Sequence, residues 1–141
     1  MKKVLIILFI FISLTGYCQV KIRIGETGKI ISTYYKNKGY TVETKYDEMF
    51  GSKQKYIEVQ TIGAKIEYYL NPKGICVVQY VYFNTNEKYI NACVDFNIST
   101  KYNSYARTIN KVYYTIKSSA DVLTGIGSFH IRKREAWQDM E

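Results

Sequence analysis

The sequence predicts an α+β fold in which two helices pack on one face of an antiparallel β-sheet of about five to six strands. Three features lead to this prediction. Two segments repeat apolar residues at helical spacing, several shorter segments alternate apolar and polar residues, and turn signals separate these shorter segments. Because several strands follow one another without an intervening helix, an antiparallel sheet is favoured over the alternating order of a parallel one.

The first helix is expected over about eleven residues after Thr27. The Thr27 hydroxyl can cap this helix, Ile31 and Tyr35 lie one turn apart on the same side, and Gly39 follows a last turn that is rich in lysine. These signals mark both the start and the end of one short amphipathic helix.

Several strands are expected after this helix, because apolar and polar residues alternate in three segments. These segments are residues 40–46, 57–61 and 66–70. The turn Asn-Pro-Lys-Gly at 71–74 ends the third strand, since proline presets one turn dihedral and glycine accepts a positive one. Residues 75–83 are apolar on both sides apart from Gln79, so we expect a central strand that a helix covers.

A second helix is expected from about residue 84 to 102. Asn84 and Glu87 form a variant of the capping box, and an apolar stripe of Tyr89, Cys93 and Phe96 follows at helical spacing. The helix then covers the central strand.

Two more strands are expected after the second helix. The first covers residues 105–117. The second covers 128–134, with Phe129 and Ile131 on one face and His130 on the solvent side of an exposed, basic edge.

The first 18 residues have the pattern of a cleaved export signal. Two lysines follow Met1, residues 4–14 are almost entirely apolar, and the small residues Gly16 and Cys18 suit the −3 and −1 positions of a cleavage site. Cleavage between Cys18 and Gln19 would leave residues 19–141 as a single exported domain, periplasmic or extracellular. The apolar run is about half of what a membrane-spanning helix needs, so we expect no transmembrane anchor.

Composition narrows the class of protein. The formal net charge is +8, but only four of the 20 basic residues are arginine, and arginine is the preferred reader of phosphates and bases. We therefore expect no nucleic-acid partner. His130 is the only histidine, and no metal, cofactor or nucleophile motif is present, so no catalytic residue, metal ligand or cofactor is assigned.

Two cysteines, Cys76 and Cys93, remain after the expected cleavage. In an oxidising compartment they could form a disulfide. Both lie in apolar surroundings, where a free thiol behaves as a small buried hydrophobe. The sequence leaves both alternatives open.

The strongest candidate surface is formed by tyrosine, of which the chain has 15. Six tyrosines lie on three strands that we expect to be neighbours: Tyr68, Tyr69, Tyr80, Tyr82, Tyr113 and Tyr114. Adjacent tyrosines in a strand point to opposite faces, so one set would pack under the helices. The other set would be exposed beside Lys65, Glu67, Gln79 and Lys111 as a platform for a protein or glycan partner. A second layer or a second copy of the chain could equally cover it.

Two resemblances bear on the architecture. "TIGAKIEYY" at 61–69 and "TINKVYY" at 108–114 echo each other, and a duplicated helix-plus-sheet unit would resemble small secreted inhibitors such as the β-lactamase inhibitory protein. With its turn-containing segment "YYLNPKGICVVQYVY", the chain as a whole resembles short exported α+β proteins of Bacteroidota. That second resemblance implies a fold and a location, and it brings no known activity.

These features lead to three functional hypotheses. The first is an exported, non-enzymatic binding or inhibitor-like module that acts through its tyrosine-rich sheet face. The second is a small secreted hydrolase that uses carboxylates, for which Asp47, Glu48, Glu58 and Glu67 are the candidates. The third is a structural envelope component that oligomerises through the exposed sheet.

Overall fold

The computed structural model describes residues 20–49 and 51–134, which form one sheet and two helices. The predicted export signal, with its cleavage site at Cys18 and Gln19, lies outside the described residues. The first half contains α2 (Gly28–Asn37), β1 (Thr41–Met49), β2 (Ser52–Gln60), β3 (Ala64–Leu70) and β4 (Cys76–Phe83). The second half contains α3 (Asn86–Asp95), β5 (Asn103–Ile109), β6 (Val112–Ala120) and β7 (Gly127–Lys133).

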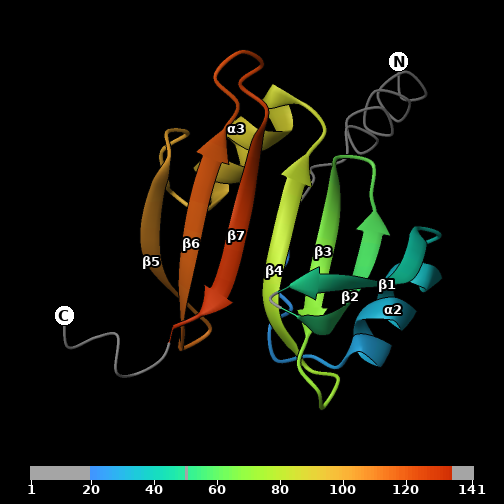
Figure 1. Cartoon of the computed structure of the whole chain (residues 1–141). Helices are drawn as coiled ribbons and strands as arrows, with labels where there is room; N and C mark the ends of the chain where they lie inside the picture. Colours follow the sequence, from blue (N-terminus) through green and yellow to red (C-terminus); the bar gives the residue numbers. More distant parts are fainter. Residues whose placement is uncertain (1–19, 50, 135–141) are drawn as a thin grey trace, which may run out of the picture.

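The seven described strands form one open antiparallel sheet in the order β1-β2-β3-β4-β7-β6-β5 (Figure 1). The α+β class is confirmed, but the sheet is larger than the five to six strands expected. The segment 105–117, expected as one strand, is a hairpin in which Asn110 and Lys111 form the turn with φ of 51° and 64°. Two positive φ angles suit a two-residue hairpin turn. The sequence signal is weak, because lysine stands where glycine is usual.

The helices begin at capping residues. Thr27 caps α2 as expected, and its side-chain oxygen accepts a hydrogen bond from the Ile30 amide at 3.4 Å. Helix α3 is capped by Thr85 rather than Asn84, and it ends at Asp95 instead of running to about residue 102. No helix in the described ranges combines the length and apolarity needed to cross a membrane.

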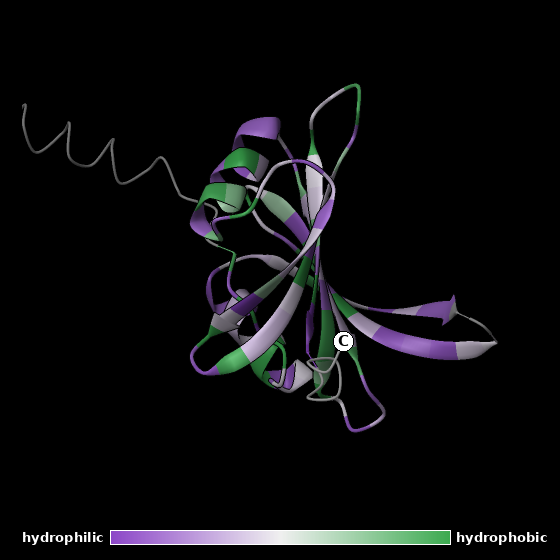
Figure 2. Cartoon of the chain, turned by 90° about the vertical axis from the view of Figure 1, so that its left-hand side faces the viewer, coloured by the Kyte–Doolittle hydropathy of each residue, from purple (hydrophilic) through white to green (hydrophobic). Residues whose placement is uncertain are grey.

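Both helices pack on the same face of the sheet, as the sequence predicts. The Tyr35 hydroxyl of α2 lies 2.6 Å from that of Tyr68 on β3, and the Tyr89 ring of α3 lies 5.9 Å from the Phe129 ring of β7. Figure 2 shows the helices on one side of the sheet, while the β1–β2 hairpin projects on the other side. The core therefore lies between the helices and one face, and neither of the two described helices covers the other face.

The segment before α2 crosses the covered face and is held by Gln79. The fully buried Gln79 side chain accepts from the Arg23 amide and donates to the Lys21 carbonyl, both at 3.1 Å. Val20, Ile22 and Ile24 pack against the core from this segment. The expectation that Gln79 lies on the exposed face is therefore wrong. Its amide is satisfied by backbone groups that are distant in sequence, which alternation along β4 could not reveal.

Apart from β1, which has no counterpart in the second half, the strand order is symmetric about the β4–β7 pair. Strands β2-β3-β4 and β5-β6-β7 are consecutive antiparallel runs of three that meet at this pair, and a helix precedes each half. The two echoing segments, 61–69 and 108–114, lie at the corresponding hairpins β2–β3 and β5–β6. The arrangement resembles a duplicated helix-plus-sheet unit, except that the first half has the additional strand β1 after its helix.

Candidate functional site

The candidate site lies on the sheet face opposite the helices. Side-chain alternation and strand register bring six aromatic residues to this face, and we call them the tyrosine face. They are Tyr56 on β2, Tyr69 on β3, Tyr80 and Tyr82 on β4, His130 on β7 and Tyr113 on β6. Register places Tyr56 directly opposite Tyr69, and Tyr80 directly opposite His130.

Four of these rings form a continuous row across four neighbouring strands. The Tyr56 and Tyr69 rings stack with centroids 4.9 Å apart and planes 15° from parallel. Tyr69 meets Tyr80 edge to face at 5.4 Å, and Tyr80 stacks on His130 at 4.5 Å. Tyr82 lies parallel to Tyr80 at 6.2 Å. Contacts of this geometry stabilise aromatic pairs beyond the area that they bury.

The structure separates the six predicted tyrosines as the sheet alternation requires. Tyr69, Tyr80 and Tyr82 come together on the open face, and Tyr113 lies on the same face with 56% of its surface exposed. The expectation that this whole set is exposed is wrong for Tyr69, which is only 8% exposed because its neighbours pack around it. Tyr68 and Tyr114 are buried on the helix side. The predicted set therefore combined residues from both faces of the sheet. Only the four on the open face belong to the candidate site.

Sequence reasoning missed Tyr56 and His130 as members of the site. Tyr56 did lie on the polar side of its strand, a signal that could have included it. His130 was expected on an exposed edge, and that expectation is wrong, because β7 lies between β4 and β6. Burial lowers the pKa of the His130 imidazole, and the positive charges of Arg132 and Lys117 lower it further. His130 is therefore a neutral ring at pH 7.

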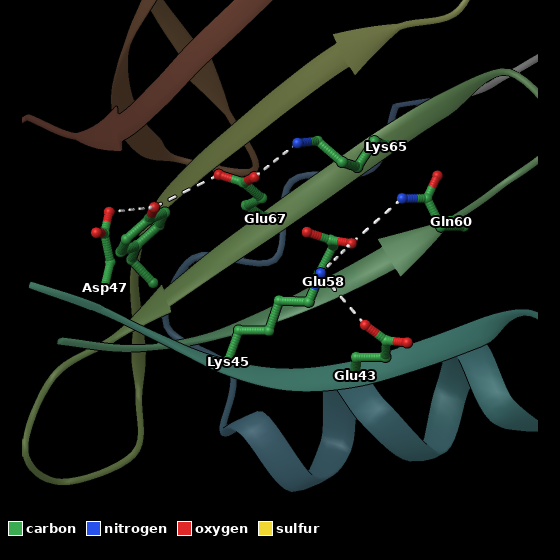
Figure 3. Close-up of polar contacts among 8 residues, drawn as sticks. Glu43, Lys45, Asp47, Glu58, Gln60, Lys65 and Glu67 are labelled. Carbon is green, nitrogen blue, oxygen red and sulfur yellow. Dashed lines mark hydrogen bonds and ion pairs between the residues drawn. The ribbon is translucent and has the colours of Figure 1, made fainter.

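An acidic region adjoins the row of rings, and Figure 3 shows it. The Tyr69 hydroxyl lies 3.4 Å from Glu67 Oε2 and 3.5 Å from Asp47 Oδ2. The Lys65 ammonium lies 3.0 Å from Glu67 Oε1 and 4.6 Å from the centroid of the Tyr82 ring. Glu67 is only 7% exposed, so the expectation that it is exposed on this face is wrong; Lys65 and Tyr69 hold its carboxylate in place.

Further carboxylates lie on the neighbouring strands. Strand register places Glu43, Glu58 and Glu67 directly opposite one another across β1, β2 and β3. Lys45 bridges the first two, with its ammonium 3.2 Å from Glu43 and 2.8 Å from Glu58 (Figure 3). The Lys45 hydrogen bond lowers the pKa of the Glu58 carboxyl, so Glu58 stays ionised. We call Glu43, Asp47, Glu58 and Glu67 the acidic end.

The phenols beside this acidic end remain protonated. Burial raises the pKa of Tyr69, and the charges of Glu67 and Asp47 raise it further. Burial and the Glu67 carboxylate raise the pKa of Tyr82 to about 12. Both phenols therefore remain hydrogen-bond donors at physiological pH, which suits a surface that binds rather than one that ionises.

A separate cavity of about 420 Å³ lies at the start of α2. Its lining consists of Thr27, Gly28, Lys29, Ser32, Thr44, Lys55, Ile57, Leu70, Lys73 and Gly74. None of these residues belongs to the tyrosine face or to the acidic end. The carboxylates that a hydrolase would need are therefore not gathered in this cavity.

Cys76 and Cys93 are both buried and free. Cys76 begins β4, and its backbone bonds to the segment before α2, whereas Cys93 lies in α3 in the other half. The sequence left open whether these cysteines form a disulfide or remain free, and in the structure they are two free, buried thiols. Burial raises the pKa of Cys76 to about 12 and also raises that of Cys93, so neither thiol is a ready nucleophile.

Comparison of the chain with protein-family models, curated proteins and solved structures found no match. Within residues 20–49 and 51–134, no three histidine, cysteine, aspartate or glutamate side chains gather in a way that could hold a metal ion.

Proposed function

We propose that this chain is an exported, non-enzymatic binding module that recognises a protein partner through the tyrosine face. One observation carries the proposal: four aromatic rings form a continuous row across β2, β3, β4 and β7 on the face without helices. Export itself rests on the N-terminal sequence pattern.

The composition of this face supports an interface. When helices cover only one side of an antiparallel sheet, the other side is usually polar. Here the second side has a row of aromatic rings in which Tyr69 is buried and the other three are half-buried. Exposed apolar patches mark interaction sites in soluble proteins, and the accessible parts of these rings, with Tyr82 and Tyr113, form such a patch. Tyrosine is enriched at protein interfaces because it combines a large apolar area with a hydroxyl. Binding by this face would cover Tyr82 and Tyr113, which are 37% and 56% exposed, together with the half-buried rings of Tyr56, Tyr80 and His130.

The ring arrangement favours a protein partner over a glycan. A sugar binds an aromatic platform through the flat face of a ring. In this row, the ring faces of Tyr56, Tyr69 and Tyr80 are engaged with their neighbours, and the Lys65 ammonium lies over Tyr82. What remains for a ligand is chiefly ring edges, hydroxyls and charged groups, which suit the mixed chemistry of a protein surface.

The shape of the face also supports a protein partner. The β1–β2 hairpin projects from the side of the sheet opposite the helices (Figure 2). Tyr69 of β3 reaches the side chain of Asp47 on β1, although β2 lies between these strands. The hairpin therefore curves toward the open face, so that side chains of the hairpin and of the row of rings can contact one partner together.

The test is capture of envelope proteins by the domain 19–141, quantified by mass spectrometry. Tyr56→Ala and Tyr80→Ala should each reduce capture of a reproducible partner at least tenfold. Tyr102→Ala is the matched control, because Tyr102 is 76% exposed and lies in the connection between α3 and β5. Unchanged capture by both face variants, with normal folding, would overturn the proposal.

A hydrolase that uses carboxylates is the second candidate, and one observation favours it. Asp47 and Glu67 both approach the Tyr69 hydroxyl, so two carboxylates are linked through a phenol on an open surface. Hydrolysis of glycoside or ester substrates that is lost in Glu67→Gln but retained in Tyr80→Ala would support this candidate against the binding module.

A structural envelope component is the third candidate. It requires the open face to be covered by another copy of the chain. Analytical ultracentrifugation of residues 19–141 distinguishes it, because a stable oligomer that Tyr80→Ala dissociates would place a second copy on this face.

A further inference from the structure

We propose that the partner presents a cationic side chain, arginine or lysine, to the acidic end of the tyrosine face. This inference rests on the proposed function and specifies the partner's chemistry. The occupant is a projecting protein segment whose positive group lies beside Glu67 and Asp47, next to the rings of Tyr69 and Tyr82.

The acidic end is complementary in charge to a cationic side chain. Four carboxylates form the acidic end, and only Lys45 and Lys65 neutralise them among the described residues. The region is therefore negative on a chain whose formal net charge is +8. A local field opposite in sign to the whole molecule selects a cationic group and orients it during encounter.

Three glutamates of like charge are neighbours in the acidic end. Glu43, Glu58 and Glu67 lie directly opposite one another on three adjacent strands. Like charges in directly opposite positions destabilise a sheet. The ion pairs of Lys45 and Lys65 offset part of this repulsion, and a positive group from a partner would offset more of it.

Lys65 already places a cation where the partner's positive group would bind. Its ammonium binds the Glu67 carboxylate and lies over the ring of Tyr82. An ion pair combined with a cation–π contact is how an aromatic surface recognises a cation. The side chain of Lys65 is 36% exposed, so it can swing into water and leave this position to a group from the partner.

The acidic end also has too few hydrogen-bond donors around Glu67 and Asp47. The Tyr69 hydroxyl approaches both Glu67 and Asp47, but a phenol has only one proton to donate. One of the two carboxylates is therefore left without this donor at any moment. A guanidinium carries five N–H donors in a flat fork and can supply what the single phenol cannot, which favours arginine over lysine.

The test uses a defined probe, the peptide acetyl-Ala-Ala-Arg-Ala-Ala-amide. Its matched control has citrulline, a neutral side chain of nearly the same shape, in place of arginine. Each is titrated to 20 mM into ¹⁵N-labelled domain 19–141. The arginine peptide should shift the amides of β1–β3 and bind at least fivefold more tightly than the citrulline peptide.

Variants locate the cation on the protein. Glu67→Gln and Asp47→Asn should each weaken binding of the arginine peptide at least fivefold, whereas Lys65→Met should strengthen it by removing the internal competitor. Glu48→Gln is the matched control, because it removes the same charge from β1 at an exposed position whose side chain points away from the open face.

Three outcomes overturn the proposal: equal binding of both peptides, no amide shift at 20 mM, or an effect of Glu48→Gln as large as that of Glu67→Gln. If these occur while Tyr80→Ala still abolishes capture of a partner, the binding function stands and only the cationic group is wrong. A face-to-face dimer of the domain would also overturn it, since a second copy would then be the occupant.

Discussion

The Tyr80 ring stacks on the His130 ring across the β4–β7 pair, with centroids 4.5 Å apart and planes 14° from parallel. This contact joins the two halves of the chain, because β4 ends the first run of strands and β7 ends the second. It also extends the row of tyrosines beyond the first half. The stack therefore makes the candidate site a property of the whole sheet.

This relationship predicts a pH dependence. In the folded protein the pKa of His130 is lowered by burial and by the charges of Arg132 and Lys117, while an unfolded chain has the ordinary value of about 6.5. As the pH falls through 6.5 toward the lower pKa of His130 in the folded protein, the unfolded chain binds a proton that the folded protein does not bind. The free energy of unfolding therefore decreases as the pH falls through this window. Above the window, the stability contributed by the neutral His130 is complete.

Urea unfolding at pH 7.5, 6.5 and 5.5 measures this effect. The wild-type domain should lose more stability over this range than His130→Gln, which has no imidazole to protonate. Carboxylates contribute equally to both proteins, so the difference between the two slopes isolates His130. If stability decreases equally with pH in the wild type and in His130→Gln, the lowered pKa of His130 is contradicted.

A second prediction concerns Gln79, whose amide holds the segment before α2. Gln79→Ala leaves the Arg23 amide and the Lys21 carbonyl without their partner and opens a cavity at a fully buried position. We expect a loss of about 2–4 kcal/mol in the free energy of unfolding. Gln60→Ala, at an exposed position on β2, should change it by less than about 0.5 kcal/mol. Equal effects in urea titration would refute the anchoring role.

A third prediction concerns the close contact between Gly127 and Tyr89. A Cβ at Gly127 would overlap the rigid, fully buried Tyr89 ring, whereas a Cβ at Gly28 would meet the movable ends of Leu70 and Ile57. Gly127→Ala should therefore cost about 1–3 kcal/mol. Gly28→Ala should cost less, because alanine also favours the helix. Thermal unfolding of the two variants ranks them, and the reverse order would contradict this packing.

A fourth prediction concerns the turn that divides the expected long strand. Lys111 has a φ of 64°, a region that is unfavourable for residues with a side chain. Lys111→Gly should therefore stabilise the domain by about 0.5–1 kcal/mol, even though glycine is more flexible when unfolded. Lys101→Gly, at an exposed loop position without positive φ, is the control and should not stabilise. A lower melting temperature for Lys111→Gly would exclude the turn described for this hairpin.

A fifth prediction concerns the two thiols. Because Cys76 and Cys93 are buried and their pKa values are raised, iodoacetamide at pH 8 should leave both unmodified in the folded domain 19–141. In denaturant without a reductant, mass spectrometry should show two alkylated cysteines per chain. Recovery of fewer than two would indicate the disulfide instead.

Much of the candidate site was predictable from local alternation. The outward direction of Tyr69, Tyr80 and Tyr82 follows from their positions in strands that alternate. Alternation could also have placed Tyr56 on this face, but the contacts of Tyr56 and His130 with the row were not predictable, because they depend on strand register. Register depends on which strands pair, and a residue's neighbours across a sheet are distant in sequence.

The sequence by itself determined the α+β class, the capped start of α2, the turn before β4 and the separation of each Tyr-Tyr pair onto opposite faces. All of these depend on interactions within a few residues. Only the tertiary structure decided that β7 lies beside β4, that Gln79 binds the N-terminal segment, and that three glutamates lie side by side at the acidic end. These features depend on pairing between distant segments, which burial of the whole core selects and no local pattern encodes.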